Sequence, residues 1–104
     1  MSDDSQIEIP QSFIAVYLPP GQRRPSLPRH ELAQRHEFCD DLANLLTDTA
    51  STKLWELGVT EQAVLERIHR GLLVEGAPVS APEAQWVIRR LAELLGWQPP
   101  PFNE

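Results

Sequence analysis

The chain has 104 residues, of which 41% are hydrophobic and 23% are charged, and its formal net charge is −6 at pH 7. This length allows one domain with its own core, and the balance of hydrophobic and charged residues excludes a wholly disordered chain. The negative charge argues against a nucleic-acid partner, because such binding depends on clustered lysine and arginine. A single cysteine, Cys39, excludes an internal disulfide.

Residues 1–8 carry acidic and polar side chains, and we expect a mobile arm there. A secretory signal would instead begin with basic and then apolar residues. No part of the chain reaches the roughly 18 consecutive apolar residues of a membrane-spanning helix. We therefore expect a cytoplasmic protein without a membrane partner.

The segment 10–18 is apolar, and its secondary structure is ambiguous. Its β-branched and aromatic residues favour a strand. In contrast, Pro10 is typical of a helix start, and Phe13, Val16 and Tyr17 share one helical face. Because no second strand is predicted elsewhere, a lone strand would need a second copy of the protein to pair its edge. A short helix is preferred, and the strand is the alternative.

The next segment, 19–27, is rich in proline and is predicted to be an extended connector. It holds the one notable basic patch of the chain, Arg23 and Arg24. Together with Arg89 and Arg90 near the end of the chain, this patch is a candidate site for an acidic peptide or a phosphate. Arginine pairs beside an apolar stripe more often lie on a solvent-exposed face, so this candidate is secondary.

Residues 28–57 are predicted to form one long amphipathic helix, because leucine and other apolar residues recur there at steps of three and four. Near its start, Glu31 and Arg35 lie four residues apart and are expected to form an ion pair. Hydroxyl-bearing residues weaken the middle of the helix, so a kink or break within 48–52 is the alternative.

Two shorter helices are predicted to follow. Gly58 is placed to end the long helix in the left-handed conformation, and Thr60 is placed to cap the next helix. After a loop, Ser80 and Glu83 match a capping box, in which each side chain satisfies a backbone donor at the start of the last helix.

The predicted fold is an all-α bundle in a single domain, residues 9–97, followed by a loose proline-rich tail, residues 98–104. Its elements are a short apolar N-terminal helix or strand (about 10–18), the long helix (about 28–57) and two shorter helices (about 61–73 and 81–95).

The densest group of reactive side chains lies on the long helix, at His36, Cys39 and Asp40. Spacings of three and four residues place such side chains on one face, where they could supply two metal ligands. A structural zinc site needs four ligands, and His30 and His69 follow no matching spacing. We therefore predict no metal or cofactor and a small, buried Cys39. A small-ligand or metal site on this face is the alternative.

Motifs typical of enzymes are missing from the sequence. It has neither a glycine-rich phosphate loop of the Walker type nor a Gly-x-Gly-x-x-Gly motif, which argues against an intrinsic ATPase. Cys39 lies in the middle of a predicted helix without a basic neighbour that would stabilise its thiolate. We predict a protein that is not an enzyme and has no catalytic residues.

The leading hypothesis is an interaction or adaptor protein, with a homodimer through the long helix as one form of it. The long apolar stripe has only two shorter helices and one short segment to cover it, which suggests a further partner.

Trp55 lies just off this stripe and either caps the core or is exposed at an interface. A weak nucleic-acid regulator acting through the arginines is a further alternative. The candidate partner surface consists of His36, Glu37, Asp40, Asp41, Trp55, Arg23 and Arg24. We expect His36, Glu37, Asp40 and Asp41 to have no role in the core.

Three stretches of the chain resemble a group of small uncharacterised proteobacterial proteins. They are residues 9–15 (IPQSFIA), 37–43 (EFCDDLA) and 86–97 (WVIRRLAELLGW). Members of that group often carry the description "ATPase with chaperone activity". Because the phosphate-binding loop is missing here, the resemblance implies a small protein that accompanies a chaperone ATPase.

Overall fold

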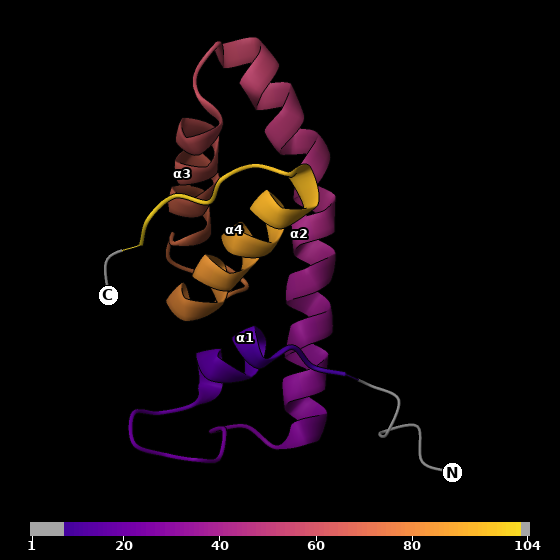
Figure 1. Cartoon of the computed structure of the whole chain (residues 1–104), viewed down its shortest axis with the longest axis vertical. Helices are drawn as coiled ribbons and strands as arrows, with labels where there is room; N and C mark the ends of the chain where they lie inside the picture. The colour runs from indigo at the N-terminus through magenta and orange to yellow at the C-terminus, as the bar shows by residue number, and fades with distance from the viewer. Residues whose placement is uncertain (1–7, 103–104) are drawn as a thin grey trace.

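The computed structural model describes residues 8–102, which form an all-α domain (Figure 1). This confirms the predicted fold class, and the segment 10–18 is helical, as preferred. Residues 1–7, which make up most of the predicted arm, lie outside the described residues. In chain order the elements are α1 (Gln11–Ile14), the 3-10 helix η2 (Ala15–Tyr17), α2 (Arg29–Leu57), α3 (Glu61–Leu72) and α4 (Ala81–Leu95).

Helix α2 runs along most of the length of the molecule (Figure 1). Its 29 residues are continuous, so the alternative of a break within 48–52 does not occur. At 1.5 Å per residue such a helix is about 44 Å long, and the longest extent of the molecule is 49 Å. Ala50 is fully buried, which anchors the polar middle of the helix to the core. Gly58, at φ 63°, ends the helix as predicted.

The caps of the two shorter helices are also those predicted. The Thr60 side chain accepts a hydrogen bond from the Ala63 backbone N–H at the start of α3. At the start of α4, the Ser80 side chain accepts from the Glu83 N–H, and the Glu83 carboxylate accepts from the Ser80 N–H. These bonds satisfy donors that a helix start leaves without partners, and they fix where each helix begins.

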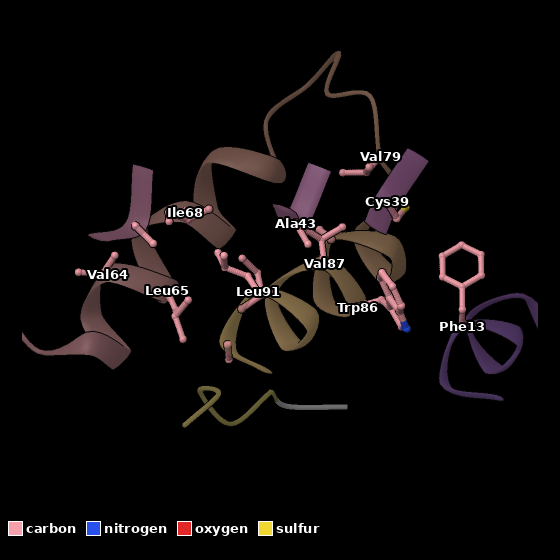
Figure 2. Close-up of a cluster of buried hydrophobic side chains, with 14 of the residues drawn as sticks. Phe13, Cys39, Ala43, Val64, Leu65, Ile68, Val79, Trp86, Val87 and Leu91 are labelled. Carbon is pink, nitrogen blue, oxygen red and sulfur yellow. The ribbon is translucent and has the colours of Figure 1, made fainter. Parts of the chain in front are cut away.

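The core is built around α4, which packs against both α2 and α3 (Figure 1). Figure 2 shows side chains from all four α-helices meeting along it, with Phe13 and Trp86 toward one end and Val64 and Leu65 toward the other. The fully buried large apolar side chains of α4 are Val87, Ile88 and Leu91. Helix α4 therefore holds α1, α2 and α3 together.

The N-terminal helix docks through one aromatic side chain. Phe13 is fully buried, and its ring lies edge-on to the ring of Trp86, with 5.1 Å between the ring centroids. The Trp86 indole also donates a hydrogen bond to the Ser12 hydroxyl at 3.0 Å. This short helix, which would be unstable alone, is thus held by tertiary contacts.

The proline-rich segment 98–102 lies against the domain, although the sequence predicts a loose tail from residue 98 onward. Pro100 is buried, and the Phe102 ring packs between two elements. Its centroid lies 4.9 Å from that of His69 on α3 and 4.8 Å from the guanidinium carbon of Arg89 on α4. Apolar contact and a cation–π contact therefore hold the described part of this segment.

Candidate functional site

The structure brings together four residues of the predicted partner surface in one surface pocket on the N-terminal half of α2. The pocket has a volume of about 570 Å³, which is within the range of about 300–1,000 Å³ that is usual for ligand sites. Its lining residues are Glu8, His30, Ala33, Gln34, His36, Glu37, Asp40 and Asp41. All of them except Glu8 belong to α2, so the pocket follows one side of the helix and is bordered by the segment before α1.

His36 and Asp40 are partly buried where they line this pocket, and both have structural partners. The His36 ring lies edge-on to the rings of Phe13 and Trp86, at centroid distances of 5.4 and 5.5 Å. Asp40 Oδ1 accepts a hydrogen bond from Arg90 Nε at 2.8 Å. The expectation of no core role is therefore wrong for His36, which packs against two core side chains, whereas Asp40 is partly exposed and forms an ion pair that joins α2 to α4. Helices α1 and α4 cover this side of α2, which the spacing along α2 does not reveal.

Glu37 and Asp41 also line the pocket, and both are exposed. Neither carboxylate makes a hydrogen bond or an ion pair with any residue in 8–102. These two residues match the prediction of an acidic surface that is free of the core.

Cys39 does not share this pocket. The side chain is fully buried in the core, because residues three positions apart on a helix still diverge by about 60° around its axis. Burial, and to a lesser extent the negative charge of Glu83, raises the pKa of the thiol to about 12. The positive charge of Arg35 opposes this rise but does not cancel it. A thiol held neutral in this way is a poor nucleophile and a poor metal ligand. Within residues 8–102, no three histidine, cysteine or acidic side chains are grouped so as to hold a metal ion.

A second polar cluster, which sequence reasoning missed, joins η2, α2 and α4. Glu83 is only 2% exposed. Its carboxylate accepts two hydrogen bonds from Arg35, both at 2.9 Å, and one from the Tyr17 hydroxyl. Arg35 also donates to the backbone carbonyl of Pro78 at 2.9 Å. The predicted ion pair of Arg35 with Glu31 is therefore replaced by a contact between residues 48 positions apart.

The role of this cluster is to stabilise the fold. Burial alone would raise the pKa of Glu83, but hydrogen bonds from Arg35 and Tyr17 outweigh it and hold that pKa below its usual value. Burial and the hydrogen bond to Glu83 raise the pKa of Tyr17 to about 12. Glu83 thus stays ionised and Tyr17 stays protonated at neutral pH, so the cluster has no proton to exchange there. It fastens η2 and α4 to α2.

Trp55 is 87% exposed, so of the two readings of this residue the structure favours exposure over a place at the edge of the core. It lies 18 residues after Glu37, and 18 residues make five whole turns, so both side chains leave α2 in the same direction. Leu45, which lies between them, is 74% exposed. We use the name outer face for the exposed residues at steps of three and four along this side of α2, which are Glu37, Asp41, Leu45, Asp48, Thr52 and Trp55.

Arg23 and Arg24, the remaining members of the predicted surface, are exposed in the connector between η2 and α2. They line neither the pocket nor the outer face. The structure thus joins the acidic residues and Trp55 along one helix and leaves these two arginines apart from them.

No protein-family model, curated protein or solved structure matches this chain. No helix within residues 8–102 is long and apolar enough to cross a lipid bilayer. The function is therefore inferred from the residues and geometry of the chain itself.

Proposed function

We propose that this protein is a non-enzymatic interaction protein that binds a partner protein through the outer face of α2. The observation that carries the proposal is Trp55, a large aromatic side chain that is 87% exposed in the last turn of a long, regular helix. Leaving an indole ring in water forgoes a large gain from burial, and exposed tryptophans are enriched at the centres of protein interfaces.

Two further features support this proposal. Leu45 is 74% exposed on the same face, so a partner has a second apolar side chain to cover. The buried Cys39 and the internally satisfied cluster around Glu83 have the character of fold-stabilising groups, and neither is placed to act on a substrate. An adaptor that accompanies a chaperone ATPase, and a homodimer through α2, are two forms that this function could take.

Photo-crosslinking tests the proposal. A benzoylphenylalanine residue in place of Thr52, which is exposed on the outer face, should give one adduct of defined mass in the native host. Trp55→Ala in the same chain should remove most of that adduct, because the aromatic anchor of the contact is lost. The matched control carries the crosslinker in place of Glu66 on α3, where no specific adduct is expected.

The proposal fails if position 52 gives no defined adduct, or if the adduct is unchanged by Trp55→Ala. An adduct with twice the mass of the chain identifies the partner as a second copy. Circular dichroism of each variant verifies that the helices remain folded.

A further inference from the structure

The outer face is acidic as well as apolar, and its acidic groups have no partners within the described chain. Glu37, Asp41 and Asp48 are exposed, and none of their carboxylates makes a hydrogen bond or an ion pair with a residue in 8–102. None of the six residues that define the face is a lysine or an arginine. The face therefore presents uncompensated negative charge around Leu45 and Trp55, on a chain whose overall net charge is also negative, at −6.

We propose that the segment seated on this face is a basic amphipathic helix. Its apolar side chains cover Leu45 and Trp55, and its lysine or arginine side chains meet the carboxylates. This inference rests on the function proposed above and specifies the chemistry of the partner.

The length and shape of the face fit a helix. The face extends from Glu37 to Trp55, two residues that lie 18 positions apart on one unbroken helix, or about 27 Å at 1.5 Å per residue. A straight row of side chains with this spacing suits a second helix laid alongside, whose own apolar residues recur at steps of three and four. The complementary segment would have about five turns.

The pocket at the N-terminal end of the face gives the partner a place for one long basic side chain. Ala33 and the His36 ring supply apolar surface in its lining, while Glu37 and Asp41 supply charge. Lysine and arginine have this same division into an apolar stem and a charged end. The volume of about 570 Å³ is ample for such a side chain.

Charge also selects against the competing occupants. A second copy docked face to face would bring the carboxylates of its own Glu37, Asp41 and Asp48 to a face that already carries these three, and like charges across an interface oppose association. Nucleic acid and anionic lipid surfaces would be repelled for the same reason. A basic protein segment is attracted by the same carboxylates that repel a second copy, nucleic acid and anionic lipid.

A synthetic peptide tests this inference directly. The probe is a fluorescein-labelled peptide of leucine and lysine, patterned as an amphipathic helix of about five turns, and binding is followed by fluorescence anisotropy. The matched peptide has glutamate in place of every lysine. We expect the lysine peptide to bind, with an affinity that falls as salt screens the charges, and the glutamate peptide not to bind.

Two triple variants of the full chain locate the contact. Glu37→Gln/Asp41→Asn/Asp48→Asn should weaken binding of the lysine peptide by about tenfold or more. Glu61→Gln/Glu66→Gln/Glu75→Gln removes the same charge from exposed positions on α3 and the following loop, and should change binding by less than about twofold. Leu45→Ala/Trp55→Ala should weaken binding without altering its salt dependence.

Equal weakening by both triple variants would show attraction to net charge alone and would overturn the inference, as would equal binding of the glutamate peptide. If the lysine peptide does not bind but the crosslink at position 52 forms and depends on Trp55, the partner is a protein of other chemistry. In that outcome the inference fails and the proposed function stands. An adduct of a second copy also overturns the inference, and loss of both signals removes the proposed function itself.

Discussion

Two sets of acidic residues in this protein, Glu83 on one side and Glu37 with Asp41 on the other, lie in opposite environments. Glu83 is 2% exposed and accepts hydrogen bonds from Arg35, Tyr17 and the Ser80 backbone. Glu37 and Asp41 are exposed on the outer face and have no such partners within residues 8–102. The same functional group therefore fastens helices together in one region and faces solvent in the other.

This difference separates residues that maintain the fold from residues that are available to a partner. A buried carboxylate is costly to keep unless its partners are in place, so changes around Glu83 should act on stability. An exposed carboxylate contributes little to stability, so changes at Glu37 should act on binding.

The largest expected effect is that of Glu83→Ala. Removal of this side chain leaves the Arg35 charge and the Tyr17 hydroxyl without their partner and also breaks the capping box of α4. Because the Arg35 side chain is 33% exposed, water can compensate part of the loss, so we expect a cost of about 3 kcal/mol, the lower end for a broken buried ion pair. Urea unfolding followed by circular dichroism measures it.

The matched variant is Glu37→Ala, which should change the free energy of unfolding by less than about 0.5 kcal/mol. Similar costs for the two variants would remove the distinction between the groups. The double variant Arg35→Met/Glu83→Leu should be more stable than Glu83→Ala, because it leaves no charge without a partner.

The helices of this fold could be predicted from the sequence because their signals are local. Apolar residues at helical spacing mark α2, and Gly58 and the Ser80–Glu83 capping box mark where helices end and begin. The bond between Arg35 and Glu83 could not be predicted, because it joins residues 48 positions apart. Helical spacing predicted Glu31, four positions away, as the partner of Arg35. The folded chain instead pairs Arg35 with Glu83 on another helix.

The candidate site was predictable in part for the same reason. Helical spacing correctly assigned Glu37 and Asp41 to an exposed side of α2. It could not show that α1 and α4 cover His36 and Asp40, since that depends on where other helices pack. The exposure of Trp55 likewise depends on how far the rest of the domain extends along α2.

A smaller effect is expected from pH. Hydrogen bonds hold the pKa of Glu83 below its ordinary value of 4.5, although burial opposes them. Its stabilising contribution is therefore complete above the ordinary value and is lost as the pH falls through the lowered pKa, because protonation favours the unfolded chain. In this acidic range the free energy of unfolding of Glu83→Gln should fall less steeply with decreasing pH than that of the unmodified protein. Parallel curves would contradict the role given to Glu83.

Ser80→Ala separates the two roles of Glu83, namely its cap on α4 and its bond to Arg35. The variant removes the hydroxyl that accepts from the Glu83 N–H and leaves the carboxylate contacts in place. We expect a cost of about 1 kcal/mol, typical of a lost N-cap, by urea unfolding. A cost as large as that of Glu83→Ala would mean that the cap, and not the ion pair, dominates.

The smallest effect on stability is expected for Trp55→Ala. The indole is 87% exposed and absent from the buried core, so the free energy of unfolding should change by less than about 0.5 kcal/mol. Acrylamide should quench a smaller share of the tryptophan fluorescence in this variant, because the two tryptophans that remain are less exposed than Trp55: Trp86 is 5% exposed and Trp97 is half-buried. A cost above about 1 kcal/mol would place Trp55 among the fold-stabilising residues. Without such a cost, any loss of binding in this variant reports on the partner contact, because the fold that presents the outer face is unchanged.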